Sequence, residues 1–486
     1  MCIDRVRLAG LALVAAFVVG ATACTNPDNS VSKLSIPELS AVSVKQPPAW
    51  DEDLRLAEAE DINPDPNVVE IELEARITEM ELVPGTLTPV WTYGGKLPGP
   101  LVRAKLGDRV IVHFKNSLPE ATSIHWHGLR ISNDMDGVPG VTQDPVEAGG
   151  EFLYDFVVRD AGTFWYHPHI NSAAQVGWGM YGPMIVEDPS DPDVFGEELV
   201  LLLSDMSLDE QGQFQPTDSG GKFGDLFGRE GSVLLVNGKV QPRLKVRTGK
   251  QQRWRVINAA RSRYYALRLP DHEFVHLGGD GGLAERATEV YRVQLVPGER
   301  ADIVFTPSDP PGTERMLQWV PTERGFGSLF NRPREDMMHI ETVADAPVRP
   351  AAIPEVLRAI EPIDVEGAIE QTLDFTIDLS NNDVVMGING IPYWNMKPLK
   401  ARVGETHVWT LTNTSAFSHP FHLHGYFFQV LNGERPREWK DTIDVPVDSE
   451  VKIAIEFDER PGVWMYHCHI LDHAEAGMMG QLRVDP

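Results

Sequence analysis

Cysteine is scarce in this chain of 486 residues, which contains only three. Cys2 and Cys24 lie near the N-terminus, so the body of the protein keeps Cys468 alone and cannot form an internal disulfide. A single remaining cysteine is either a buried inert thiol or a residue with a special chemical role. The residues around Cys468, described below, favour the second interpretation.

Positive charge and long apolar runs are also in short supply. The chain has 43 Lys and Arg against 71 Asp and Glu, which gives a formal net charge of −28. This acidity argues against nucleic acid and anionic lipid surfaces as partners. Beyond the first residues, no segment has the apolar length that a membrane span requires.

The N-terminus has the pattern of an export signal. Arg5 and Arg7 precede an apolar run from Leu8 to about Val19 that is too short for a good membrane span. We therefore expect a signal peptide over residues 1–23. The absence of an Arg-Arg pair favours the general export route over the twin-arginine route. The predicted location is the periplasm or the cell surface.

The end of this signal allows two kinds of processing. Residues 21–24 read Ala-Thr-Ala-Cys and resemble a bacterial lipoprotein signal, in which Cys24 becomes the lipidated first residue. The alternative is ordinary cleavage near Ala23. Residues 24–65 are rich in Ser, Pro, Asp and Glu, so we expect a flexible tether there.

A repeated strand pattern divides the rest of the chain into three. In each repeat a Gly is followed nine residues later by Asn, with an alternating apolar run between them: Gly107 to Asn116, Gly249 to Asn258 and Gly404 to Asn413. The repeats lie about 140–155 residues apart, which is the size of a domain. Short alternating runs with few helical patterns predict an all-β protein of three sandwich domains, over residues 66–190, 195–345 and 360–486.

Histidine is concentrated in four short motifs. Ten of the fifteen His fall in them: His125-Trp-His127, His167-Pro-His169, His419-Pro-Phe-His422-Leu-His424 and His467-Cys-His469-Ile-Leu-Asp-His473. On a strand, residues two apart point to the same face about 6.6–7 Å from each other, so His-x-His presents two imidazoles side by side. Four such pairs exceed the needs of one metal ion and favour a cluster. Imidazole suits copper, zinc and iron alike.

Cys468 narrows the choice of metal. It lies between His467 and His469, so it should point to the opposite face of their strand. There it could bind a separate metal ion with His419, His473 and Met478, and two His, one Cys and a weak axial Met form a blue-copper electron-transfer site. A structural zinc site needs only four ligands and would leave most of these residues unexplained.

Taken together, the four motifs and their spacing resemble those of the multicopper oxidases, the family of laccases, bilirubin oxidases, ascorbate oxidases and bacterial copper-efflux oxidases. The resemblance covers residues 66–486. It implies three consecutive cupredoxin-like domains, which are Greek-key β-sandwiches, with no copper in the middle one. It also implies four copper ions: one of type 1, one of type 2 and two of type 3.

The resemblance assigns roles to individual residues. It implies a type 1 copper bound by His419, Cys468, His473 and axial Met478, and type 2 ligands His125 and His422. The type 3 ligands would be the other paired histidines: His127, His167, His169, His424, His467 and His469. Asp472 would relay protons to the reduced oxygen, and Asp136 would lie near the type 2 copper. A solvated or capping carboxylate is the alternative for each Asp.

The implied reaction couples one-electron oxidation of a reducing substrate to four-electron reduction of O2 to water. The donor is either a phenol or aromatic amine, as for a laccase, or Cu(I) or Fe(II), as for a metallo-oxidase in metal tolerance. Only 14 scattered Met disfavour a Met-rich copper-efflux enzyme. A copper-free scaffold of the cell envelope conflicts with the complete ligand set. We expect a monomer.

Overall fold

The computed structural model describes residues 54–83, 85–325, 333–379, 384–433 and 435–486. The expected signal peptide, Cys24 and most of the expected tether therefore lie outside the described residues. The chain from Ala41 to Pro486 forms one unit. None of the helices in its described part has the length and apolar character needed to cross a bilayer.

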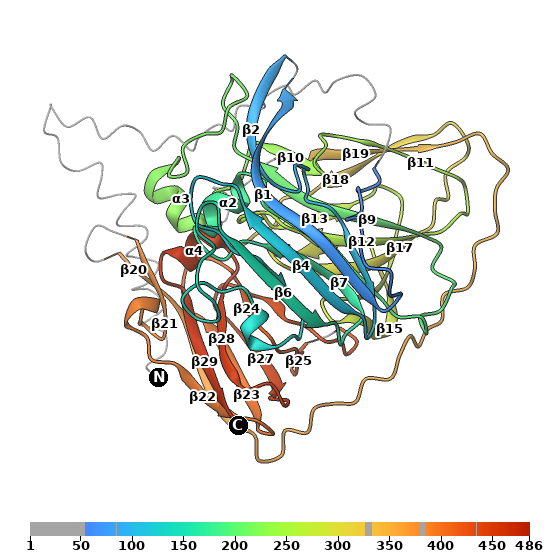
Figure 1. Ribbon diagram of the computed structural model, residues 1–486. Coiled ribbons are helices and arrows are strands. Elements are labelled where there is room, and N and C mark those ends of the chain that lie inside the picture. Colours follow the sequence, from blue (N-terminus) through green and yellow to red (C-terminus); the bar gives the residue numbers. More distant parts are fainter. Residues whose placement is uncertain (1–53, 84, 326–332, 380–383, 434) are drawn as a thin grey trace, which may run out of the picture. The chain divides into compact units, whose positions relative to one another are not determined.

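Six β-sheets make up the described chain, two for each of three consecutive segments (Figure 1). This confirms the predicted all-β fold. In the first segment one sheet has the order β2-β1-β4-β6, built from β1 (Val68–Val83), β2 (Thr86–Tyr93), β4 (Arg109–Asn116) and β6 (Glu151–Val157). The other has the order β3-β8-β7-β5, built from β3 (Val102–Lys105), β5 (His125–His127), β7 (Gly162–His167) and β8 (Gly182–Glu187).

The middle segment contains the largest of the six sheets. Its first sheet, in the order β10-β9-β12-β17-β14-β15, consists of β9 (Glu197–Met206), β10 (Val233–Val236), β12 (Gln252–Asn258), β14 (Phe274–Gly279), β15 (Gly282–Val290) and β17 (Arg300–Phe305). Its second sheet, in the order β11-β19-β18-β13-β16, consists of β11 (Arg243–Val246), β13 (Tyr265–Arg268), β16 (Val293–Leu295), β18 (Glu314–Trp319) and β19 (Glu335–Thr342).

The last segment repeats the plan of the first. Its sheet β21-β20-β23-β27-β25 consists of β20 (Ile369–Asp378), β21 (Val385–Ile388), β23 (Thr406–Asn413), β25 (Phe428–Val430) and β27 (Ser449–Glu456). Its sheet β22-β29-β28-β24-β26 consists of β22 (Leu399–Arg402), β24 (His419–Leu423), β26 (Thr442–Val445), β28 (Gly462–Cys468) and β29 (Met479–Asp485). Separate apolar cores fill the three sandwiches.

The Gly-to-Asn repeat has a structural reason. Its strands are β4, β12 and β23, and each pairs in parallel with the first strand of its own segment. Each ends at its buried Asn, whose side-chain amide donates to a backbone carbonyl at 2.8, 3.0 and 2.8 Å in the three segments. The side-chain oxygen accepts the backbone N–H two residues later at 2.9, 3.0 and 3.0 Å, which turns the chain out of the strand.

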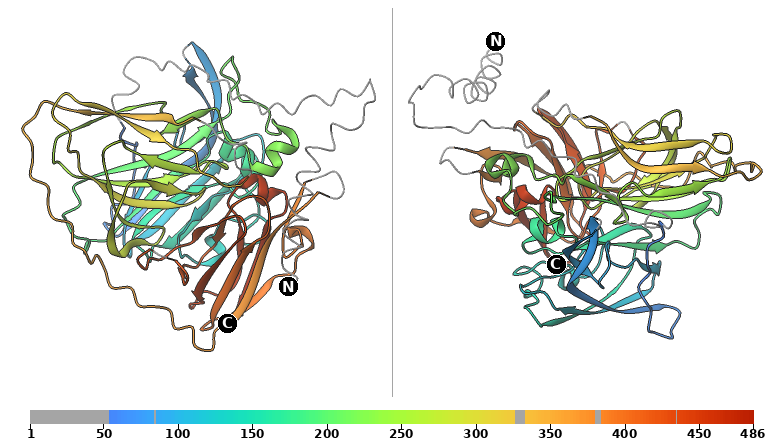
Figure 2. Two further views of the ribbon diagram at one scale, coloured as in Figure 1. Left: turned by 180° about the vertical axis from the view of Figure 1, so that it is seen from behind. Right: turned by 90° about the horizontal axis from the view of Figure 1, so that it is seen from above.

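The few helices lie around the ends of the histidine strands. In the described part of the chain, two 3₁₀ turns, η1 (Asn133–Met135) and η3 (Tyr393–Asn395), accompany three short α-helices: α2 (Ser172–Gly177), α3 (Gly221–Phe227) and α4 (Leu471–Glu475). The α2 and α4 helices follow the second His of the first and last segments' closing motifs. Both α2 and α3 pack against α4 (Figures 1 and 2). The middle segment therefore reaches the last one beside its histidine strand.

Candidate metal centres

The eight paired histidines come together where the first and last segments meet. β5 pairs with β7, and β24 pairs with β28, so each segment contributes two adjacent strands of histidines. Their ring nitrogens converge in three sets, each within 4.8 Å: His125, His127 and His422; His127, His167 and His469; His169, His424 and His467. Every set contains ligands from both segments. The spacing predicted two imidazoles side by side within each motif, and the structure also brings together the imidazoles of the first and last segments.

Some ring nitrogens of this cluster have a hydrogen-bond partner in the protein, and others have none. Nδ1 of His125, His167, His422 and His467 lies 2.8–3.0 Å from a backbone carbonyl oxygen. Several opposite nitrogens are buried without a hydrogen-bond partner: Nε2 of His125, His167 and His422, Nδ1 of His127 and both nitrogens of His469. Buried polar atoms are rarely left unpaired, and metal ions would satisfy one nitrogen on each of these rings. The residues present therefore fit a metal cluster.

Burial keeps these imidazoles in the neutral form that binds metals. It lowers the pKa of seven of them: His127, His167, His169, His422, His424, His467 and His469. For His169 the pKa falls to about 3. The neighbouring imidazoles add to this effect, because each would repel a charged one.

A second centre surrounds Cys468 in the core of the last segment. Its Sγ lies 3.6 Å from His419 Nδ1 and 3.5 Å from His473 Nδ1, and these two nitrogens are 3.1 Å apart. The other ring nitrogens are fixed, His419 by the Ser415 hydroxyl at 2.8 Å and His473 by the Leu226 carbonyl at 3.0 Å. Three ligand atoms in a small triangle suit the trigonal plane of a blue-copper site.

Met478 completes the surroundings of this triangle. It is fully buried in the same core as Cys468, and its carbonyl accepts the Cys468 N–H at 3.0 Å. Its neighbour Met479 is only half-buried. Burial raises the pKa of the Cys468 thiol well above its ordinary value, so the thiolate forms only with a positive charge beside it. A bound copper ion would supply that charge.

The two carboxylates singled out by sequence occupy different surroundings. Asp136 is buried beside the histidines, with Oδ2 2.9 Å from His424 Nδ1 and Oδ1 3.4 Å from His125 Nδ1. Asp472 instead faces the middle segment. Arg229 donates to it from its backbone N–H at 3.0 Å and its side chain at 2.5 Å, and Arg261 Nε donates at 2.9 Å. Asp472 thus ties α4 to the middle segment, and its proton-relay role stays a prediction.

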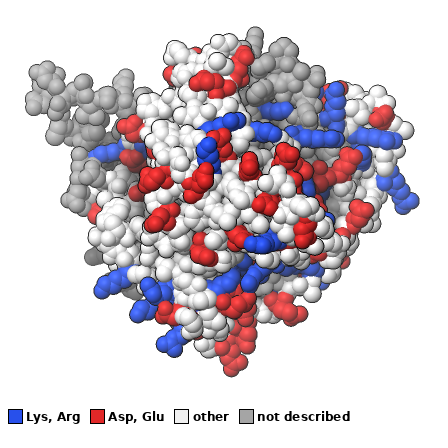
Figure 3. Space-filling view, viewed as in Figure 1, with Lys and Arg blue, Asp and Glu red and all other residues white. Residues whose placement is uncertain are grey.

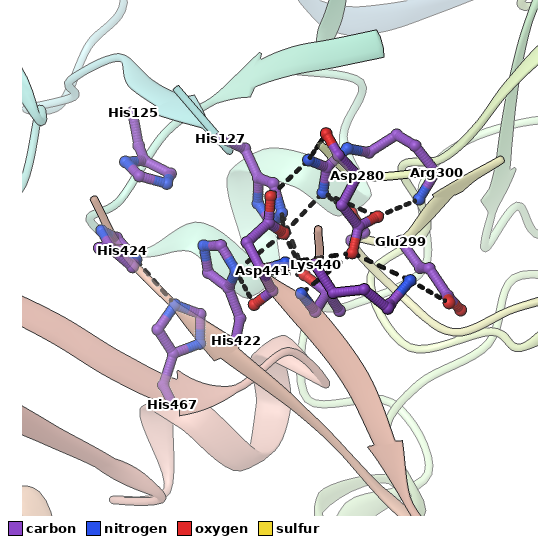
Figure 4. Close-up of polar contacts among 12 residues, drawn as sticks. His125, His127, Asp280, Glu299, Arg300, His422, His424, Lys440, Asp441 and His467 are labelled. Atoms are coloured by element: carbon purple, nitrogen blue, oxygen red, sulfur yellow. Dashed lines mark hydrogen bonds and ion pairs between the residues drawn. The ribbon is translucent and has the colours of Figure 1, made fainter. Parts of the chain in front are cut away.

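Sequence reasoning missed Asp441. Its Oδ1 lies 3.3 Å from His127 Nε2 and 3.4 Å from His422 Nδ1, and Arg300 of the middle segment donates to both of its oxygens (Figure 4). Burial alone would raise the pKa of Asp441, but Arg300 outweighs it and holds that pKa well below its usual range. The need for such a partner becomes visible only in the structure, where Arg300 begins a strand buried at every position and its charge must be paired.

Gly298 lets the middle segment approach the cluster closely. Its φ is +86°, and an added Cβ would lie 2.8 Å from His469 Cδ2 and 3.0 Å from His127 Cε1. We expect Gly298→Ala to displace both rings and release copper from the histidine cluster, while the blue colour of the Cys468 site persists. Copper analysis and absorption spectra measure this. Gly312→Ala is the matched control, because its φ is +85° but nothing lies within 4 Å. Equal copper loss in both variants would contradict the expectation.

Comparison with known proteins identifies the chain. Models of the multicopper oxidase family match residues 75–191, 197–315 and 366–486. The chain belongs to the multicopper oxidase family. It is 30% identical to the multicopper oxidase MmcO of Mycobacterium tuberculosis, over 82% of this chain and 84% of that protein.

Solved structures of multicopper oxidases share the fold. One, described as a metallo-oxidase from Campylobacter jejuni, is 30% identical, with a TM-score of 0.80 over 89% of this chain and 94% of that one. Another, a laccase from Pediococcus acidilactici, is 28% identical, with a TM-score of 0.79 over 91% of this chain and 95% of that one. The chain is thus an oxidoreductase that uses O2 and a reducing substrate.

Multicopper oxidases carry one type 1, one type 2 and two type 3 coppers, and the two centres described here fit them. The type 1 copper would be held by His419, Cys468 and His473, and the others by the eight paired histidines. When bound, the coppers supply the one-electron transfers and the reduction of O2. The chain supplies ligands of fixed orientation and, through Cys468 and its two neighbouring histidines, a short covalent connection between the centres.

Proposed function

We propose that this oxidase takes its electrons from a small organic donor, a phenol or an aromatic amine, that docks against helix α3. The observation that carries this proposal is the covering of His473. This ligand is fully buried, and its Nε2 donates to the Leu226 carbonyl of α3 rather than to solvent. The donor therefore meets the surface of α3 before it can exchange electrons with the type 1 site.

The α3 helix has an aromatic character. Phe223 stacks on Phe227 with ring centroids 4.3 Å apart, and Phe227 packs edge-on against Phe417 at 4.4 Å. An aromatic donor can stack on such rings, whereas Cu(I) favours thioether ligands and Fe(II) favours imidazole and carboxylate. The sequence of α3 contains no Met.

Two carboxylates in and after α3 are engaged by arginines. Asp225 pairs with Arg229 at 2.6 Å, and Glu230 pairs with Arg324 at 2.9 Å and with Arg263 at 3.3 Å. Paired carboxylates are poor ligands for an arriving cation, because the arginine already neutralises them. On the face seen in Figure 3, acidic and basic side chains are interspersed as well. These features favour a neutral organic donor.

Oxidation of Cu(I) or Fe(II) is the second candidate, since the Campylobacter relative is described as a metallo-oxidase. Oxygen uptake by the copper-loaded protein with a methoxyphenol and with Cu(I) separates the two. We expect fast uptake with the phenol and slow uptake with Cu(I). The reverse result would replace the organic donor by a metal ion, and uptake with neither would contradict both.

A variant of α3 tests where the donor docks. We expect Phe223→Ala to raise the KM for the phenol about 2- to 10-fold, the worth of one aromatic contact, with little change for Cu(I). Tyr291→Ala is the control, because Tyr291 is an aromatic residue between β15 and β16 that is 71% exposed. An unchanged KM for Phe223→Ala would move the docking site away from α3.

We also propose that the protein is exported and anchored by a lipid on Cys24. The leader and the Ala-Thr-Ala-Cys sequence support this proposal. In a bacterial host, Cys24→Ser should shift the protein from the membrane fraction to the soluble fraction outside the cytoplasm. Identical fractionation of the parent and the variant would contradict the anchor.

A further inference from the structure

The middle segment has no paired histidine, yet it reaches the trinuclear cluster through a buried set of charges. This set, here called the brace, consists of Asp280, Glu299, Arg300, Lys440 and Asp441 (Figure 4). Asp280 lies in the turn between β14 and β15, and Glu299 and Arg300 lie at the start of β17. Lys440 and Asp441 precede β26 of the last segment. The side chains of all five are at most 9% exposed.

Asp441 forms the end of the brace that touches the cluster. The rings of His127 and His422 stack with centroids 3.8 Å apart, and Asp441 Oδ1 lies beside their edges, 3.3 Å from His127 Nε2 and 3.4 Å from His422 Nδ1. The Thr442 hydroxyl donates to Asp441 Oδ1 at 2.8 Å. Its single hydrogen is used there, so the nearby ring nitrogens, His127 Nε2 at 3.3 Å and His422 Nδ1 at 3.1 Å, must donate to it.

These hydrogen bonds select one tautomer for each ring. A proton on His127 Nε2 leaves Nδ1 as the nitrogen with a free lone pair, and a proton on His422 Nδ1 leaves Nε2 free. These two nitrogens are the buried ones that lack a partner. The two rings thus offer different nitrogens to the metals, and the shared partner that sets the difference is Asp441 with its neighbour Thr442.

Asp441 is itself fixed from the middle segment. Arg300 Nη1 donates to Oδ1 at 2.7 Å and Nη2 to Oδ2 at 2.5 Å, a two-pronged bond that allows only one orientation of the carboxylate. Asp280 Oδ1 accepts the Arg300 N–H at 2.9 Å, and Asp280 Oδ2 accepts the backbone N–H of Thr442 at 3.1 Å. The Asp280 carboxylate therefore binds the backbone of Arg300 and also the backbone next to Asp441, the residue that Arg300 contacts.

Lys440 offsets part of the negative charge of the brace. Its ammonium lies 3.1 Å from Asp280 Oδ2 and 2.8 Å from Glu299 Oε1. Burial of so many charges is unfavourable unless each is paired, so the geometry of the whole set is mutually determined. Removal of one member leaves its partners with unsatisfied buried charge.

We propose that Arg300 is a positioning residue of the trinuclear site: through Asp441 it orients His127 to bind metal by Nδ1 and His422 to bind by Nε2. The middle domain thereby takes part in copper binding although it donates no ligand. The proposal rests on the four-copper chemistry of the family and is independent of which donor reduces the type 1 site.

Arg300→Met tests the proposal, because it keeps an unbranched side chain but removes every side-chain N–H donor. The Asp441 carboxylate beside the His127 and His422 rings then loses its fixed orientation, although the Asp441 carbonyl oxygen stays 3.0 Å from His422 Nδ1. We expect the blue absorption to persist, the electron paramagnetic resonance spectrum of the type 2 copper to change, and that copper to be lost to a chelator about 10- to 100-fold more readily. The kcat should fall while the KM for the donor stays, since the donor acts at the type 1 site.

Arg253→Met is the matched control. Arg253 is a buried arginine of the same sheet, and it pairs with Asp302 of β17 at 2.6 Å instead of with Asp441. We expect the control to keep the type 2 spectrum. A folded Arg300→Met protein whose type 2 spectrum and copper retention match those of the parent would overturn the proposal, as would equal changes in both variants.

Asp441→Asn provides a second test if Arg300→Met does not fold. The amide keeps the shape of Asp441, but Arg300 donates to both carboxylate oxygens, so in either orientation the NH2 group faces an Arg300 donor and one bond of the brace is lost. We expect the same change in the type 2 spectrum with the blue colour intact. A parental spectrum would overturn the proposal. A wrong donor assignment would appear only in the KM values and would leave these spectra unchanged.

Discussion

Replacing Cys468 with Ser is expected to give a folded, colourless protein that consumes no oxygen. The hydroxyl has nearly the shape of the thiol, so the core of the last domain should persist. The free energy of unfolding should fall by about 1–3 kcal/mol, because the hydroxyl is a buried polar group without a full set of hydrogen-bond partners. A hydroxyl does not supply the thiolate that a blue-copper site requires. The variant therefore lacks a type 1 copper from which electrons can pass through residue 468 to His467 and His469.

Absorption spectra, copper content and oxygen uptake of the Cys468→Ser protein measure this. The histidine cluster should keep its copper, since its ligands are unchanged. Met478→Leu and Met479→Leu form a matched pair beside it: the first should shift the blue spectrum, and the second should leave it unchanged, because Met479 is only half-buried. Sustained turnover by the serine variant would refute the electron path through Cys468.

Removal of copper should make the protein labile to mild acid. Burial lowers the pKa of nine histidines: the seven of the trinuclear cluster named above, together with His419 and His473 of the type 1 site. Below about pH 6.5 these histidines bind protons in the unfolded chain but stay neutral in the folded apo-protein. The free energy of unfolding therefore falls as the pH falls. For His169 and His473 this continues to about pH 3.

The size of this effect follows from the number of groups. Each histidine contributes about 1.4 kcal/mol per pH unit, so nine can exhaust a typical stability of about 5–15 kcal/mol within one or two pH units. Four buried carboxylates act in the opposite sense. Burial raises the pKa of Asp205 and Glu475, that of Asp280 to about 6 and that of Asp444 to about 7, so they favour the folded state as pH falls, but four groups do not offset nine.

Thermal unfolding of apo- and copper-loaded protein between pH 7.5 and pH 5 measures the difference. In the loaded protein the metal occupies the nitrogens, and protons can bind only after copper leaves. We therefore expect the melting temperature of the apo-protein to fall steeply in this range and that of the loaded protein to change little. Parallel curves would mean that the imidazoles are not neutral in the folded apo-protein.

Much of the candidate site could be predicted because its information is local. A His-x-His pair fixes two rings on one face of a strand, and an intervening Cys468 must face the other way, whatever the rest of the chain does. The Gly-to-Asn strand recurs because each of its Asn side chains makes the same turn. Such features depend on neighbours in sequence, so three domains and two kinds of centre could be expected.

The parts that sequence did not reveal depend on contacts between distant segments. Asp441 and Arg300 are single residues without a repeating pattern, and they meet only because two domains pack together. The cover of His473 by Leu226 joins residues 247 positions apart. The partners of Asp472 likewise lie on the middle domain, so spacing could place this residue beside His473 but could not say which way its carboxylate points.

Each set of trinuclear ligands draws on both the first and the last domain, and this has a consequence for biogenesis. A growing chain displays half of every such site long before the other half has been synthesised. His467 and His469 belong to the last domain, so a chain that stops before this domain cannot complete the sets that contain them. Acquisition of the metal therefore marks a polypeptide whose first and last domains have both been made and have docked correctly, and bound copper would hold these two domains together.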